Sequence, residues 1–123
     1  MKRFLTPVFA LMMMATPALA HDPHPGRNGG TVYEMADTYH VEVVAKGKTL
    51  DIYLSDHDDK TVASTGFQGV AILVINGQSV RVTLAPVGDN RLTGTAGVDL
   101  PQRPRGAIQL TPPGRRMMQA QVR

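Results

Sequence analysis

Residues 70–84 have the sequence VAILVINGQSVRVTL, in which two β-rich runs flank a turn-forming dipeptide. The runs, residues 70–75 and 79–84, are rich in Val, Ile, Leu and Thr, the residue types that favour strands. Asn76 and Gly77 between them both tolerate the positive φ that a two-residue hairpin turn requires. The stretch therefore predicts two antiparallel strands joined by a tight turn.

The same composition recurs along the chain, and no window shows sustained helical periodicity. Turn-forming residues such as Lys46-Gly47-Lys48 and Pro112-Pro113-Gly114 separate the short runs. The predicted strands are residues 31–35, 39–45, 49–55, 70–75, 79–84, 91–95, 107–110 and 117–122. We expect an all-β domain over residues 31–123, a single immunoglobulin-like β-sandwich of seven to eight short antiparallel strands.

The first twenty residues have the pattern of a secretory signal peptide. Lys2 and Arg3 precede an apolar run over residues 4–14, and Ala18-Leu19-Ala20 is a small-residue cleavage site. The apolar run is too short to span a bilayer. We therefore expect residues 1–20 to be removed in export, which leaves no integral membrane segment.

Composition excludes several classes of chemistry. The chain has no cysteine, so it forms no disulfide and offers no thiolate ligand. Removing Lys2 and Arg3 with the leader lowers the formal net charge from +3 to about +1. A nearly neutral protein of this kind is not expected to bind nucleic acid.

Residues 21–30 are mostly Pro, Gly, Asn, His and charged residues, which predicts a flexible arm ahead of the first long strand. Cleavage after Ala20 would make His21 the mature N-terminus. Its α-amine and imidazole could then chelate one metal ion, and such a histidine brace favours copper. Pro23 excludes the square-planar motif that needs a deprotonated amide at the third residue, because proline has no N–H.

The histidines are expected to meet on one side of the first strands. In residues 39–43, alternation sends Tyr39, Val41 and Val43 to one face and His40 with Glu42 to the other. Pairing across the turn at residues 46–48 places His40 opposite Tyr53 or Ser55. That position is close to the loop Asp56-His57-Asp58.

Imidazole nitrogens and carboxylate oxygens suit copper(II), with zinc as the alternative. A simpler interpretation is that the histidines are exposed surface residues and that the aspartates form local turns. The candidate ligands are His21, His24, His40, His57, Asp56 and Asp58.

Four stretches together carry a resemblance to a known group of proteins: PGRNGG at residues 25–30, YHVEV at 39–43, LSDHD at 54–58 and GDNRL at 88–92. The chain resembles small exported periplasmic β-sandwich proteins of Gram-negative bacteria that are associated with heavy-metal or copper resistance and efflux. In that group a His-Gly-Gly stretch often precedes the first strand, whereas here four residues separate His24 from Gly29.

The resemblance implies a periplasmic metal-binding protein that acts in metal handling or resistance, with His40 and His57 at matching positions and an efflux-system component as its partner. The alternative is a non-catalytic interaction module that docks to an efflux or envelope assembly through an edge strand or its basic half. An enzyme is not expected. The chain has no Trp and few aromatic residues for a sugar-binding surface, and it shows no catalytic motif.

Overall fold

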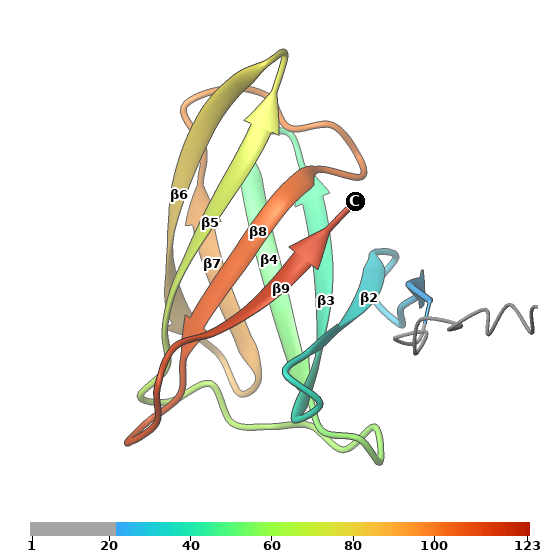
Figure 1. Cartoon of the computed structure of the whole chain (residues 1–123), viewed down its shortest axis with the longest axis vertical. Helices are drawn as coiled ribbons and strands as arrows, with labels where there is room; N and C mark the ends of the chain where they lie inside the picture. The colour runs from blue at the N-terminus through green and yellow to red at the C-terminus, as the bar shows by residue number, and fades with distance from the viewer. Residues whose placement is uncertain (1–21) are drawn as a thin grey trace, which may run out of the picture.

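The computed structural model describes residues 22–123, which form an all-β structure of nine strands without a helix (Figure 1). The strands are β1 (His24–Pro25), β2 (Thr31–Met35), β3 (Tyr39–Lys46), β4 (Thr49–Ser55), β5 (Gln68–Ile75), β6 (Gln78–Val87), β7 (Arg91–Thr95), β8 (Arg105–Thr111) and β9 (Met118–Val122). The predicted leader and His21 lie outside the described residues. Within residues 22–123, no helix has the length and apolarity needed to cross a membrane.

The hairpin predicted from residues 70–84 is confirmed. Ile75 pairs with Gln78 across the turn, and Asn76 and Gly77 have φ values of 52° and 75°. All eight predicted runs form strands, and β2, β4 and β7 have the predicted bounds. The ninth strand, β1, lies in the segment predicted to be an arm, where it pairs antiparallel with β2.

All nine strands belong to one antiparallel sheet, in the order β1-β2-β3-β4-β7-β6-β5-β8-β9. The pairing does not divide them into the two separate sheets expected of a sandwich. Instead the sheet curls into a half-barrel, so that β9 lies beside β2 (Figure 1). The Tyr33 hydroxyl donates a hydrogen bond of 2.9 Å to the carbonyl of Arg123 between these two ends.

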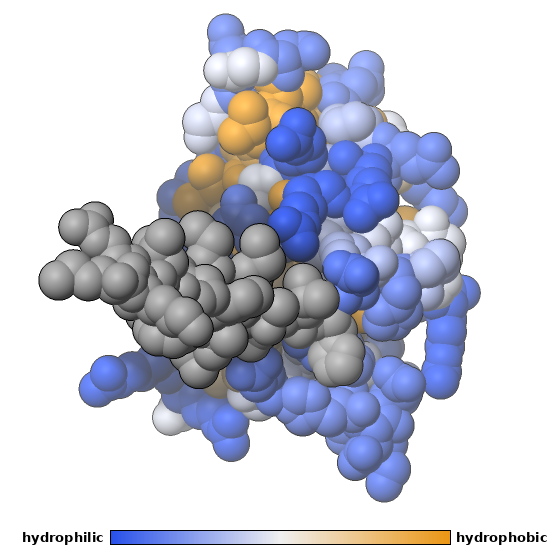
Figure 2. Space-filling model, turned by 45° about the vertical axis from the view of Figure 1, so that its right-hand side comes forward, coloured by the Kyte–Doolittle hydropathy of each residue, from blue (hydrophilic) through white to orange (hydrophobic). Residues whose placement is uncertain are grey.

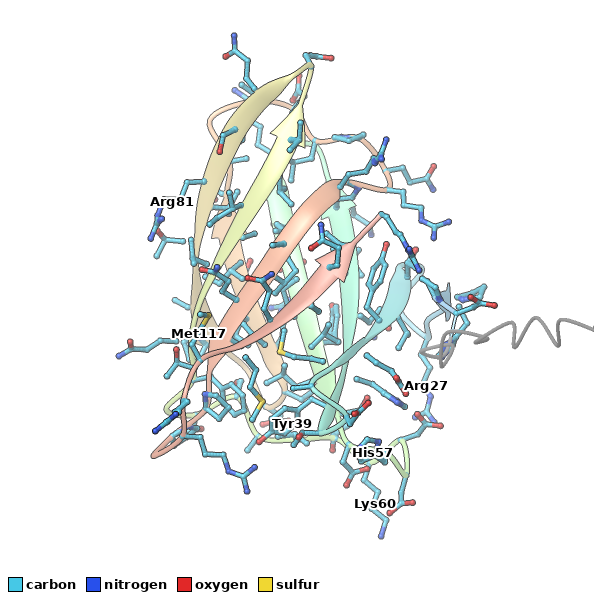
Figure 3. The ribbon with its side chains drawn as sticks, in the orientation of Figure 1. Arg27, Tyr39, His57, Lys60, Arg81 and Met117 are labelled. Carbon is cyan, nitrogen blue, oxygen red and sulfur yellow. The ribbon has the colours of Figure 1, made fainter. Side chains whose placement is uncertain are left out.

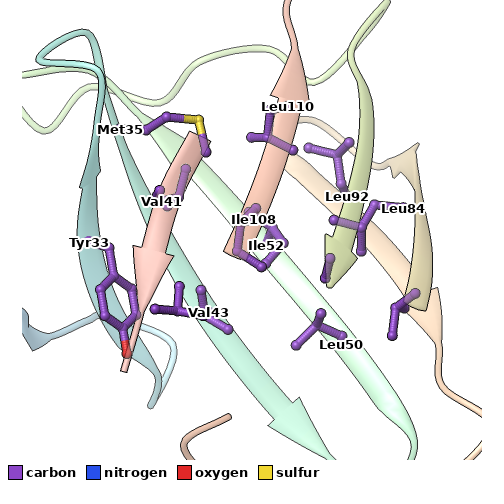
Figure 4. Packing of buried hydrophobic residues seen from close by; sticks show 14 of the residues in the cluster. Tyr33, Met35, Val41, Val43, Leu50, Ile52, Leu84, Leu92, Ile108 and Leu110 are labelled. Carbon is purple, nitrogen blue, oxygen red and sulfur yellow. The ribbon is translucent and has the colours of Figure 1, made fainter. Parts of the chain in front are cut away.

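The hydrophobic core fills the inside of this curl (Figure 4). Val41 and Val43 of β3 are buried, as predicted, and so are the predicted inward residues of β4, Leu50, Ile52 and Leu54. They belong to the same cluster as Ile108 of β8 and residues of β5. Burying one such side chain stabilises the fold by roughly 1.5–3 kcal/mol. This packing therefore determines which face of β3 and β4 is left for other roles.

The sheet bends along β6. Residues up to Leu84 pair with β5, whereas Ala85, Pro86 and Val87 pair with β7. Beside this bend, Gly94 of β7 lies against the backbone carbonyl of Thr83, and a Cβ atom at Gly94 would overlap that oxygen. The close approach of the two strands therefore requires a glycine.

We expect Gly94→Ala to lower the free energy of unfolding by about 1–3 kcal/mol, the usual cost of overpacking, because the added methyl group must push β6 away. Urea unfolding of the two proteins measures the difference. Gly97→Ala is the matched control, since a Cβ atom there meets open space. Equal effects of the two substitutions would contradict the close-approach argument.

Candidate metal centre

The candidate site lies on the outer face of β2, β3 and β4, the side away from the core. Because Tyr33, Val41 and Leu54 point inward, their neighbours in sequence point outward. The pairing register then aligns Glu34 with His40, and His40 with Ser55. The prediction that His40 lies opposite Tyr53 or Ser55 is thus confirmed.

The loop after β4 folds back toward His40. Ser55 forms an isolated bridge with Thr61, and the Asp56 carboxylate accepts hydrogen bonds from the backbone N–H groups of Asp58 and Lys60, at 2.9 and 3.0 Å. Asp59 adopts a positive φ of 59° in this tight turn. The loop is therefore closed by its own backbone and by Asp56, and it carries His57 and Asp59 back to the outer face.

Three histidines from separate segments meet here. The ring centroids of His24 and His40 are 6.4 Å apart, and those of His40 and His57 are 5.8 Å apart. A hollow of about 470 Å³ is lined by all three, together with Asp22, Val32 and Glu34. Figure 3 shows His57 at the β2–β3–β4 side of the molecule, with Arg81 and Met117 on the opposite side.

His40 is the central residue of the three. Its side chain is only 14% exposed, whereas His24 and His57 are exposed residues. The Nδ1 atom of His40 lies 3.3 Å from Oδ1 of Asp59, and Nε2 lies 3.8 Å from Oε1 of Glu34. Each ring nitrogen therefore faces a carboxylate.

The histidine rings are adjacent but have not converged. Among residues 22–123, no three His, Asp or Glu side chains are already arranged to hold a metal ion. Two imidazoles that bind one ion at about 2.0–2.1 Å bring their ring centroids to about 5 Å. The observed separations exceed that value by about 1 Å, a distance that rotation of the exposed His24 and His57 side chains can close.

The remaining predicted ligands have other positions. The Asp56 carboxylate is occupied by backbone N–H groups, which is the turn-forming role considered as the simpler interpretation. Asp58 is exposed, and the contact described for it is its own N–H donated to Asp56. His21 lies outside the described residues, while its neighbour Asp22 lines the hollow.

Sequence reasoning missed Glu34 and Asp59. The partner of His40 on β2 could have been found by pairing residues 31–35 with residues 39–43 across the short turn between them, which aligns Glu34 with His40. No comparable pattern identifies Asp59, because its place depends on the path of the loop. Four adjacent loop positions, residues 56–59, carry a histidine or an aspartate, and spacing alone does not distinguish them.

A buried carboxylate anchors the segment that carries His24. Glu42 of β3, only 6% exposed, accepts hydrogen bonds from the backbone N–H groups of Asn28 and Gly30 and from the side-chain amide of Asn28. The turn over residues 26–30 therefore covers Glu42 on the outer face. It leads directly from β1 into β2, so it sets the position at which His24 pairs with Val32.

No family model, curated protein or solved structure matches this chain.

We expect Glu42→Gln to loosen the turn and to lower the free energy of unfolding by about 1–3 kcal/mol, because an amide –NH₂ replaces one of two accepting oxygens and leaves a donor unpaired. Urea unfolding measures stability, and amide hydrogen exchange at Asn28 and Gly30 measures the loosening. Asp37→Asn, in the exposed β2–β3 turn, is the control. Unchanged exchange at Gly30 in Glu42→Gln would refute the anchoring role.

Proposed function

We propose that this protein binds a divalent metal ion, copper(II) in preference to zinc(II), in the hollow between β1, β2, β3 and the β4–β5 loop. The observation that carries the proposal is the gathering of His24, His40 and His57 around one hollow. The chain has only four histidines, and these three come from separate segments. Glu34 lies beside them and adds a carboxylate oxygen to the three imidazoles.

The donor types support the choice of metal. Neutral imidazole is a ligand for copper and zinc, and copper(II) stands above zinc in the affinity order for nitrogen and oxygen donors. Because the chain lacks cysteine, no thiolate competes for the ion. His21 remains a candidate for an additional ligand, through its imidazole and, after cleavage, its α-amine.

We further propose that the protein acts in the periplasm in metal handling or resistance, with a component of a heavy-metal efflux system as its partner and without catalysis. The leader-like pattern of residues 1–20 supports export. An open hollow with two exposed histidines suits an ion that is received and passed on.

We also propose that the fold is an immunoglobulin-like sandwich in which the two layers remain joined in one sheet. The half of the sheet formed by β2, β3, β4 and β7 and the half formed by β6, β5, β8 and β9 enclose one core, as two layers of a sandwich do (Figure 4).

Docking to an envelope assembly is the second candidate. It is supported by the sheet order, in which β1 and β9 each end the sheet with one side unpaired by another described strand. Arg103, Arg105 and Arg123 also line a shallow hollow together. The face shown in Figure 2 is mainly hydrophilic around the grey residues, with an apolar area toward its upper end. A docking module would keep its partner when the histidines are replaced.

Copper(II) titration by calorimetry tests the site. We expect His40→Ala and His57→Gln each to reduce the affinity by at least about 100-fold, more than the loss of a residue that only supports a ligand. Lys60→Gln, exposed on the same loop, is the control and should bind as the unchanged protein does.

A second titration compares a protein that begins at His21 with one that carries an extra alanine before it. Weaker binding by the extended form would assign a ligand role to the N-terminus. Failure of every form to bind would favour the docking module.

Copper(II) affinity should fall as the pH is lowered from 8 to 5, because a protonated imidazole cannot bind the ion. Titrations in a buffer series with little metal affinity measure this dependence. An affinity that stays constant over the range would be incompatible with histidine ligation.

A further inference from the structure

Both ring nitrogens of His40 face a carboxylate, and the two contacts differ in kind. The Nδ1 atom is within hydrogen-bond distance of Asp59, at 3.3 Å, whereas the 3.8 Å between Nε2 and Glu34 is too long for a hydrogen bond. A neutral imidazole carries its proton on one nitrogen and a lone pair on the other. The hydrogen bond to Asp59 favours the proton on Nδ1 and leaves the lone pair on Nε2.

Nε2 of His40 and Oε1 of Glu34 are separated by nearly the distance expected of two ligands of one metal ion. Two ligand atoms at about 2.0–2.1 Å from a tetrahedrally coordinated ion lie about 3.4 Å apart, so a movement of about 0.4 Å from the observed 3.8 Å would bring both atoms to bonding distance of one ion. Both residues line the same hollow as His24 and His57. Glu34 and His40 are also direct partners in the β2–β3 ladder, so the strand backbone holds them next to each other.

Asp59 is placed differently. Its side chain is 66% exposed, and Asp59 does not line the hollow that holds the three histidines. A backbone hydrogen bond of 3.1 Å from Asp59 N–H to the Asp56 carbonyl helps to hold it in the loop. It therefore contacts the side of the His40 ring that faces away from Glu34.

We propose that the metal ion binds His40 through Nε2 with Glu34 as a carboxylate ligand, and that Asp59 is a positioning residue that fixes the tautomer and orientation of the His40 ring. This inference rests on the proposed function and deepens it. The ligand set becomes three imidazoles and one carboxylate, with a carboxylate–histidine–metal triad formed by Asp59, His40 and the ion. Glu34 and Asp59 thus replace Asp56 and Asp58 as the acidic residues of the site.

Zinc(II), which is diamagnetic, is the probe for the test. Calorimetry measures its affinity for the unchanged protein and for Asp59→Asn, and ¹⁵N NMR of the imidazoles identifies the nitrogen that binds the ion. Asparagine suits the positive φ of Asp59, so the loop is expected to keep its path. Asp58→Asn, one residue earlier and also exposed, is the matched control.

We expect Asp59→Asn to weaken zinc binding about 10- to 100-fold, the usual effect of removing such a supporting carboxylate, and Asp58→Asn to leave it unchanged. The NMR spectrum of the zinc-loaded protein should show zinc on Nε2 of His40 and the proton on Nδ1. In Asp59→Asn, the metal-free protein should shift toward the other tautomer, which a purely structural role of Asp59 would not cause.

Glu34→Gln should weaken zinc binding at least about 10-fold, with Asp37→Asn as its control. Zinc found on Nδ1 of His40, equal affinities for the Asp58 and Asp59 variants, or full affinity in Glu34→Gln would each overturn the inference while leaving a histidine metal site in place. Absence of zinc and copper binding by the unchanged protein would instead overturn the proposed function itself.

Discussion

The alternation of side chains along β3 is the constraint on which the site depends. Val41 and Val43 are buried in the core, and a strand sends successive residues to opposite faces, so His40 and Glu42 must lie on the outer face. A slip of one residue in the register would bury His40 and expose Val41. The same apolar packing that stabilises the half-barrel therefore also selects the residues that are available to the proposed metal site. The two strands that pair with β3, β2 and β4, extend the outer face to Glu34 and Ser55.

The outer face is itself partly covered, and this explains why a carboxylate is buried there. Glu42 would lose its hydration beneath the turn over residues 26–30, but three N–H donors replace the water. The turn in return has its donors satisfied by a residue of the central strands. As a result, the short β1 pairs with β2 although two residues are too few to form a stable strand alone. Glu42 thus positions the segment that carries His24, although Glu42 is not itself a ligand in the proposed site.

Local patterns in the sequence predict most of the fold. Period-2 alternation and the Asn76-Gly77 turn were enough to locate eight strands and the inward residues of β3 and β4, because both depend on neighbours in sequence. The single curled sheet could not be predicted in this way, since it depends on contacts such as those between β2 and β9, which are distant in sequence. The candidate site, too, could be predicted only in part. The proximity of His40 and His57 followed from one hairpin, whereas β1 and the contact from Asp59 depend on the folded paths of a turn and a loop.

The proposed histidine ligands differ in exposure, and this difference affects how easily an ion would be bound and released. His40 is mostly buried and flanked by two carboxylates, while His24 and His57 are exposed and must each be ordered by the ion. Ordering these side chains costs conformational entropy, and this cost would lower the affinity of the site for the ion. The described residues contain no buried side-chain polar atom without a partner, and none of the residues that line the hollow belongs to the hydrophobic core. An ion in this hollow would therefore contact no residue of the core, in contrast to a closed structural zinc site. Such a site suits reversible loading and release, which is the property that a metal-handling protein requires.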